Sequence, residues 1–271
     1  MSQPAFTDVR RFASIDSTNR YLLDEARAGA PEGVVAVADH QTAGRGRLGR
    51  RWEAPPGSNL LLSVLLRPAL AQGQRHLATT AVALAAVDAI DAIDAMEAVG
   101  SVPGPKVGIK WPNDLVAADG RKVAGVLAEA DLASAVGGSS SSAAPVVVGI
   151  GINVNWPADG EELPTELRGT AASLRQLRGA EVDREDLLDA LLVSLGPRVA
   201  ALSSVPGRAQ LAHDLRGRCT TVGQTVRVVL ADESFVGTAT SVTDDGHLVV
   251  DADGTLRTVV AGDVVHLRPG A

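Results

Sequence analysis

The longest stretch of the chain without glycine or proline covers residues 74–99 and is rich in alanine, valine and isoleucine. Such a composition over this length favours one long helix. Acidic side chains recur at every third position, at Asp88, Asp91, Asp94 and Glu97, and they would form a charged stripe along it. A membrane-spanning helix needs about 20 mostly apolar residues. We therefore expect an amphipathic helix packed on a β-sheet, and no membrane partner.

Charge and cysteine content limit the classes of protein that fit this sequence. The 271 residues include 25 basic and 32 acidic side chains, which gives a formal net charge of −7. A chain of this charge has no general attraction for nucleic acid or for an anionic membrane. Its single cysteine, Cys219, cannot form an internal disulfide, and the first residues, MSQPAFTDVRRF, lack the apolar core of a signal peptide. We expect a cytoplasmic protein with no nucleic-acid partner.

Helices and strands are expected throughout the first 216 residues. A helix should cover residues 16–28, capped by Asp16 or Ser17. Apolar runs predict strands at 34–39, 60–67, 107–111, 115–118, 122–130 and 146–155. Residues 134–145, SAVGGSSSSAAP, should form a mobile loop between two strands. Residues 182–216 should be helical, with interruptions near Gly196-Pro197 and Pro206-Gly207.

The pattern changes after residue 216. Short β-rich runs at 225–230, 235–243, 248–251, 256–260 and 264–268 are separated by glycine-containing turns, which is typical of a small β-barrel. The chain as a whole therefore predicts an α+β fold, with a mixed β-sheet flanked by helices in residues 1–217 and a small β-barrel in residues 218–271.

One segment concentrates positive charge. Residues 41–51, QTAGRGRLGRR, hold four arginines, three glycines and no acidic residue. The segment could be a solvated surface loop. Glycines, however, let backbone amides approach an anion closely, and guanidinium groups offer paired donors to phosphate or carboxylate. The usual P-loop ending is missing. We expect this loop to bind a phosphorylated ligand, and its arginines to repel one another and keep the loop mobile until an anion arrives.

The three lysines of the chain are Lys106, Lys110 and Lys122, whereas the other basic residues are arginines. Each retained lysine is a candidate for a function that needs a compact ammonium group, although exposed lysines also occur without one. Lys122 begins a predicted strand in which Gly125 would let a ligand approach the backbone. Lys110 and Asp114 lie on either side of a predicted tight turn.

Two further segments have both a structural and a functional interpretation. Ser17-Thr18-Asn19 can simply cap the first helix, or its exposed amides can bind a carboxylate or a ureido carbonyl. Residues 149–155, GIGINVN, contain two glycines of a dinucleotide fingerprint, but Val154 stands where the third is needed, which excludes a Rossmann site. The block can be a buried strand whose glycines ease packing, or its glycines can face a ligand. The five histidines have no metal-ligand spacing, so no structural metal is expected.

These blocks, in this order, resemble the biotin protein ligase family. The resemblance rests on Ser17-Thr18-Asn19, QTAGRGRLG with Trp52 beyond it, KWPNDL from Lys110, KVAGVL from Lys122, and GIGINVN. It covers residues from about 15 to 216, and the β-rich tail resembles the SH3-like C-terminal domain of the family. The implied fold is a class II synthetase-like ligase core. The short segment before Ser17 suggests the form without a DNA-binding N-terminal domain.

The resemblance implies an enzyme that joins biotin to ATP, giving biotinyl-5′-adenylate, and then transfers biotin to a lysine of a biotin carboxyl carrier domain of an acyl-CoA carboxylase. Mg²⁺ would accompany ATP, and the protein would be a monomer or a weak homodimer. Two alternatives remain: a lipoate-type ligase of the same superfamily, and a DNA-binding biotin-responsive regulator. The GRGR segment favours biotin, and the acidic composition disfavours the regulator.

The resemblance also implies roles for individual residues. Lys122, Arg45 and Arg47 would be catalytic. The biotin site would contain Ser17, Thr18, Asn19, Gln41, Gly44, Arg45, Gly46, Arg47, Lys122 and Gly125. The nucleotide site would contain Arg47, Trp52, Lys110, Asn113 and Asn153. Asp114 would hold Mg²⁺ or a lysine.

Overall fold

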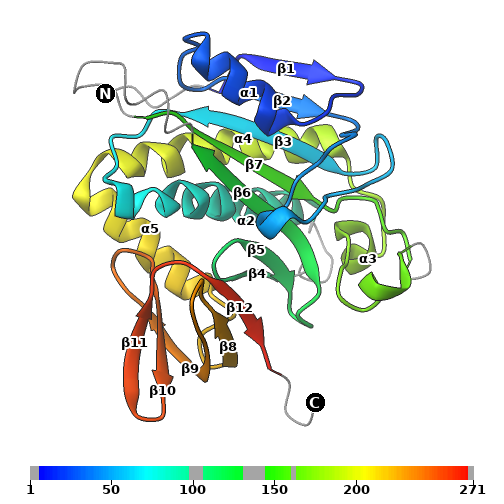
Figure 1. The fold of residues 1–271 in the computed structure, drawn as a ribbon. Coiled ribbons are helices and arrows are strands. Elements are labelled where there is room, and N and C mark those ends of the chain that lie inside the picture. The colour runs from blue at the N-terminus through cyan, green and yellow to red at the C-terminus, as the bar shows by residue number, and fades with distance from the viewer. Residues whose placement is uncertain (1–5, 98–105, 131–143, 160–162, 268–271) are drawn as a thin grey trace.

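Two β-sheets organise the chain (Figure 1). The structure, a computed structural model, describes residues 6–97, 106–130, 144–159 and 163–267. The larger sheet has seven strands in the order β1-β2-β3-β7-β6-β5-β4. Their bounds are β1 (Val9–Phe12), β2 (Val35–Ala38), β3 (Leu60–Leu66), β4 (Val107–Lys110), β5 (Asp114–Ala117), β6 (Lys122–Ala130) and β7 (Val146–Ile152). Strands β1 and β2 are parallel and the other paired neighbours are antiparallel, so the sheet is mixed, as predicted.

Helices pack on both faces of this sheet. They are α1 (Thr18–Arg27), α2 (His76–Glu97), α3 (Leu174–Arg178), α4 (Arg184–Ala200) and α5 (Val205–Arg218). Successive residues of β3 point to opposite faces: Leu65 packs with Leu22 of α1, whereas Val64 and Leu66 join the large core that contains α2. Because every residue of β3 is buried, its sequence, LLLSVLL, is almost continuously apolar.

Helix α2 lies inside the protein rather than on its surface. By length and composition alone it could cross a membrane, but 72% of its apolar stretch is buried. Three carboxylates of its acidic stripe face other helices: Asp88 pairs with Arg198 of α4, Asp91 with Arg218 of α5, and Asp94 with Arg178 of α3. The expected amphipathic helix is therefore present, and ion pairs with the surrounding helices explain the spacing of its carboxylates.

One expectation for the first 217 residues is wrong. The helical region is not interrupted at Gly196-Pro197, because α4 continues through Pro197 to Ala200. The interruption lies at residues 201–204, and Pro206 sits in the first turn of α5, where a missing N–H costs nothing. Strand β1 and helix α3 were not expected from the sequence. The predicted mobile loop at 134–145 lies almost wholly outside the described residues.

The second sheet contains the five predicted C-terminal strands in the order β11-β10-β9-β8-β12, all antiparallel. They are β8 (Thr225–Val229), β9 (Ser234–Val242), β10 (Leu248–Ala252), β11 (Thr255–Val259) and β12 (Asp263–His266). Trp111, just after β4, joins the two sheets: its indole Nε1 donates to the Gly246 carbonyl oxygen at 3.0 Å. The domain boundary at residue 217 stays a prediction.

The burial of α2 leads to a test of stability. Leu84, 1% exposed, lies at the centre of the core. We expect Leu84→Ala to lower the free energy of unfolding by about 2–5 kcal/mol through lost burial and a cavity. Met96→Ala in the same helix is the control, because Met96 is 77% exposed. Denaturant unfolding should show a clearly lower free energy of unfolding for Leu84→Ala than for Met96→Ala. Equally small losses of stability in both variants would contradict the buried position of the helix.

Candidate functional site

A cavity lies on the face of the central sheet that α1 only partly covers. Its floor is formed by β3, β6 and β7, and the arginine-rich loop lies above it. Of the predicted site residues, the cavity lining includes Ser17, Thr18, Asn19, Gln41, Arg45, Gly46, Arg47, Trp52, Asn113, Lys122 and Gly125. The lining also includes Leu62, Ser63, Val126 and Leu127, for which no role was expected from the sequence, and Gly149, Ile150 and Gly151 of the GIGINVN block.

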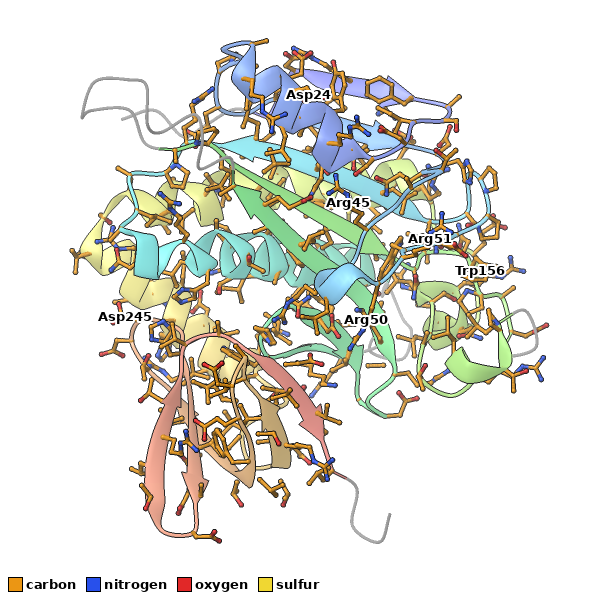
Figure 2. All side chains as sticks on the ribbon, viewed as in Figure 1. Asp24, Arg45, Arg50, Arg51, Trp156 and Asp245 are labelled. Carbon is orange, nitrogen blue, oxygen red and sulfur yellow. The ribbon has the colours of Figure 1, made fainter. Side chains whose placement is uncertain are left out.

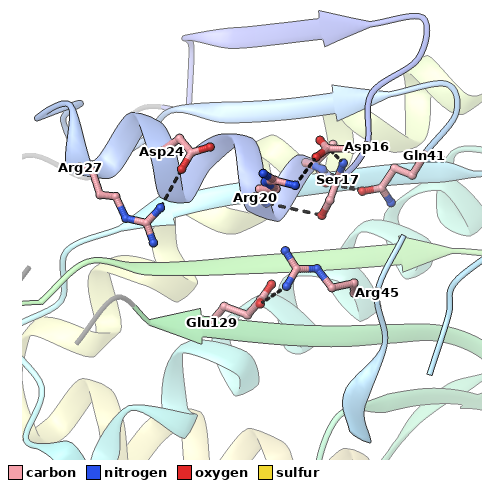
Figure 3. A network of polar contacts seen from close by, with 9 residues as sticks. Asp16, Ser17, Arg20, Asp24, Arg27, Gln41, Arg45 and Glu129 are labelled. Atoms are coloured by element: carbon pink, nitrogen blue, oxygen red, sulfur yellow. Dashed lines mark hydrogen bonds and ion pairs between the residues drawn. The ribbon is translucent and has the colours of Figure 1, made fainter. Parts of the chain in front are cut away.

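One end of the cavity is polar and uncharged. The N-terminus of α1 lies there, with Ser17 as its cap. The backbone N–H of Thr18 donates to Gln41 Oε1 at 2.8 Å, and the Ser63 hydroxyl lies 2.6 Å from Asn19 Oδ1. Because Asn19 is 5% exposed, the Ser63 hydroxyl and not water satisfies its amide oxygen. Glu129 and Arg45 lie next to this end and form an ion pair, as Figure 3 shows.

The other end of the cavity carries positive charge. Lys122 Nζ lies 2.7 Å from Asp114 Oδ1 and 5.4 Å from the centre of the Trp52 ring. Arg47 donates to Asn113 Oδ1 and to the Gly262 carbonyl oxygen, both at 2.8 Å. Gly262 belongs to the turn before β12, so Arg47 also links the loop to the second sheet.

Glycine residues make room for Trp52 above the floor. A Cβ atom on Gly151 would lie 2.5 Å from Trp52 Cε2, and one on Gly125 would lie 2.9 Å from Lys122 Nζ. A methyl group on Gly151 would overlap the rigid indole, whereas one on Gly125 would displace the flexible end of Lys122. The Trp52 indole N–H is buried, and among the described residues it has no hydrogen-bond partner. The GIGINVN block thus has a role in shaping the cavity, since Gly151 leaves the space that Trp52 fills and Gly149 leaves the space for the Asn19 amide.

The arginine-rich loop does not lack countercharges, contrary to our expectation. Arg45 pairs with Glu129 of β6, and Arg50 pairs with Asp263 of the second sheet at 3.3 Å. Figure 2 shows Arg45 nearer α1 and Arg50 nearer the second sheet on the loop that crosses the front of the molecule. The idea of mutually repelling arginines is therefore wrong for these two, because the protein itself supplies their carboxylate partners.

Four predicted site residues lie outside the cavity lining. Asp114 is held in the ion pair with Lys122. Asn153 is buried, and its amide donates to the Ala172 carbonyl oxygen at 3.1 Å. Gly44 is confined by the backbone, since a Cβ there would lie 2.3 Å from the Trp52 carbonyl oxygen. Lys110 lies near His266, and burial together with that positive charge lowers the pKa of His266 to about 4. Their predicted roles stay predictions.

The chain combines a mixed sheet flanked by helices with a separate antiparallel C-terminal sheet, which is the fold of solved biotin protein ligases. The chain belongs to the biotin/lipoate A/B protein ligase family, whose model matches residues 11–153. A second model, for the biotin protein ligase C-terminal domain, matches residues 221–267.

Comparisons with individual proteins support membership of the same family. The biotin–acetyl-CoA-carboxylase ligase of Mycobacterium tuberculosis is 40% identical over 94% of this chain and 88% of its own length. The bifunctional ligase/repressor BirA of Escherichia coli is 32% identical over 92% of this chain and 71% of its own length. The biotin protein ligase of Aquifex aeolicus, solved in complex with biotin and ATP, shares the fold at a TM-score of 0.76 and 24% identity, covering 97% of this chain and 99% of that one.

The contact between Gly151 and Trp52 can be tested directly. We expect Gly151→Ala to displace the indole, because the new methyl group would overlap it. Amide hydrogen exchange of residues 45–52 in the ligand-free protein should then rise about tenfold, since the loop loses its anchor. Gly217→Ala is the matched control, because nothing lies within 4 Å of a Cβ at that position. Unchanged exchange in Gly151→Ala would show that Trp52 does not hold the loop.

Proposed function

We propose that this chain is a biotin protein ligase, which activates biotin with ATP and transfers it to a lysine of a biotin carboxyl carrier domain of an acyl-CoA carboxylase. The observation that carries the proposal is the polarity of the cavity, with an uncharged polar end at α1 and a cationic end at Lys122 and Arg47. Biotin has the same polarity, since a neutral ureido ring is joined by an aliphatic chain to a carboxylate. Membership of the family supports the same function.

The uncharged end would hold the ureido ring. A buried ureido group must keep its hydrogen bonds, and Ser17, Thr18 and Gln41 offer hydroxyl and amide partners at the start of α1. Apolar lining from Leu62, Val126 and Leu127 would contact the aliphatic chain. The ligand would then lie along the cavity with its carboxylate pointing toward Lys122.

The cationic end would support the activation step. A biotin carboxylate oxygen attacks the α-phosphorus of ATP, a new P–O bond forms, and the bond to pyrophosphate breaks. Two anions must meet, so the ammonium of Lys122 and the guanidinium of Arg47 would offset their repulsion and stabilise the developing charge. Trp52 would cover the adenylate. In the transfer step, a neutral lysine amine of the acceptor attacks the acyl carbon, AMP leaves, and the amine loses a proton.

Asp114 is the residue that we propose for contact with Mg²⁺. Mg²⁺ in nucleotide sites is held by one or two carboxylates together with phosphates and water. Asp114 offers one carboxylate next to the cationic end of the cavity, where it pairs with Lys122. Within the described ranges, no group of three or more His, Cys, Asp or Glu residues is placed to hold a metal. We propose that Mg²⁺ enters with ATP, whose phosphates would supply further ligands.

Pyrophosphate release separates the candidate functions. The protein is incubated with MgATP and either biotin or lipoate, and then with the matching acceptor domain. We expect pyrophosphate release with biotin and not with lipoate, because the polar end suits a ureido ring. Pyrophosphate release only with lipoate would favour the alternative ligase. We also propose that the enzyme works in the cytoplasm as a monomer or weak homodimer, without a nucleic-acid partner. Sedimentation of the ligand-free protein tests the oligomeric state.

Lys122 provides a test of the activation step. We expect Lys122→Ala to slow adenylate formation by about 100- to 1,000-fold, because one electrostatic stabiliser of the transition state is lost. Lys122→Arg should also be slow, since a planar guanidinium does not replace a compact ammonium. Lys106→Ala is the control, as Lys106 is exposed and does not line the cavity. A Lys122→Ala enzyme with near-normal pyrophosphate release would refute this role.

Arg47 provides a test of retention. Biotinyl-adenylate is a mixed anhydride that water or any free amine can attack, so a closed loop would protect it. We expect Arg47→Ala to increase the release rate of the adenylate by a larger factor than it decreases the rate of adenylate formation, because the loop loses its bonds to Asn113 and Gly262. Arg51→Ala is the control in the same loop, with a side chain 69% exposed. Equal release rates in both variants would argue against a closing loop.

A further inference from the structure

Glu129 is a carboxylate of strand β6 that the proposed chemistry does not use. Its side chain is 24% exposed and lies beside the uncharged end of the cavity. One oxygen, Oε1, accepts from Arg45 Nη1 at 3.1 Å, and the other, Oε2, accepts from Asn19 Nδ2 at 2.8 Å. Figure 3 shows the side chains of Glu129 and Arg45 pointing toward each other. The carboxylate thus connects the loop to the first turn of α1.

The bonds of Asn19 to its other partners orient its amide toward Glu129. Asn19 Nδ2 also donates to the Leu127 carbonyl oxygen at 3.2 Å, and Asn19 Oδ1 lies 2.6 Å from the Ser63 hydroxyl. The amide of Asn19 is therefore oriented with its N–H groups toward β6. Both oxygens of Glu129 face donors, which is the arrangement that an ionised carboxylate requires.

The cations around the cavity differ in their partners. Arg45 has Glu129, and Lys122 has Asp114. Arg47 contacts neutral acceptors, Asn113 Oδ1 and the Gly262 carbonyl oxygen, and no ion pair is recorded for it within the described part of the chain. The uncompensated positive charge of the lining is therefore concentrated on Arg47. An anionic group entering the cavity would be drawn to that end.

We infer that Glu129 is a specificity-determining residue that sets the polarity of the cavity. It neutralises Arg45 and positions it, so that the end at α1 accepts an uncharged polar head and leaves the anionic group of the ligand to Arg47. The identity of that head as a ureido ring rests on the proposed function. The charge distribution itself does not, because it follows from the ion pairs of the ligand-free protein.

Replacing Glu129 by glutamine removes the charge and keeps the size of the side chain. The single amide oxygen can accept from Arg45 or from Asn19, and the amide nitrogen then faces the other donor, so one of the two bonds is lost. Arg45 would become a second uncompensated cation, at the wrong end of the cavity. Small anions should bind there, and they should compete with the ureido ring.

The experiment titrates inorganic sulfate into the ligand-free protein and, separately, measures how sulfate weakens biotin binding without ATP. In Glu129→Gln, sulfate should bind about fivefold more tightly, and biotin about fivefold more weakly, than in the wild type, as fits loss of a partly exposed ion pair. Glu185→Gln is the matched control, because it removes the exposed pair between Glu185 and Arg11, neither of which lines the cavity. Thermal unfolding is recorded for each variant.

Each outcome decides one question. Wild-type affinities for both sulfate and biotin in a folded Glu129→Gln protein would overturn the inference. Glu129→Asp keeps the negative charge, and it provides the test alone if the glutamine variant fails to fold. Its sulfate affinity should equal that of the wild type. A fivefold gain in its sulfate affinity would refute the charge of Glu129 as the cause. A wild-type protein that does not bind biotin would refute the proposed function instead, while the direct sulfate titration would still test Glu129.

Discussion

The close approach of Trp52 to the floor of the sheet is the constraint on which the site depends. Strands β6 and β7 carry glycines at the positions that face the loop, and a methyl group at Gly151 would already overlap the indole. Because these glycines have no side chains, space for a cavity remains between the sheet and the loop. Lys122 and the polar side chains of α1 can reach this space only because the glycines leave it open.

The loop is tied at both of its sides. Arg45 reaches Glu129 of the central sheet, whereas Arg47 and Arg50 reach Gly262 and Asp263 of the second sheet. A movement of the C-terminal sheet would thus displace the loop and change the shape of the cavity. This arrangement also explains how an acidic protein keeps a dense group of arginines, because each of the paired guanidiniums has a protein acceptor while the ligand is absent.

Much of the fold could be predicted because its signals are local. The apolar run of β3 and the glycine turns between the C-terminal strands are readable from neighbouring residues. The four residues of β1, VRRF, carry no such pattern, and only pairing with β2 makes them a strand. The partner of Arg45 could not be predicted, since Glu129 is 84 residues away along the chain and looks like a surface residue in an alternating strand. The interruption expected at Pro197 was wrong because α4 accommodates proline within the helix.

The central claim is that the ligand lies along the cavity with its uncharged head at α1 and its anionic groups at Lys122 and Arg47. A crystal structure of the protein with biotinyl-5′-adenylate bound tests it most directly. The ureido ring should lie within hydrogen-bond distance of Ser17, Thr18 and Gln41, and the phosphate next to Arg47. A ligand bound in the reverse direction, with its phosphate beside Arg45 and Glu129, would contradict the claim.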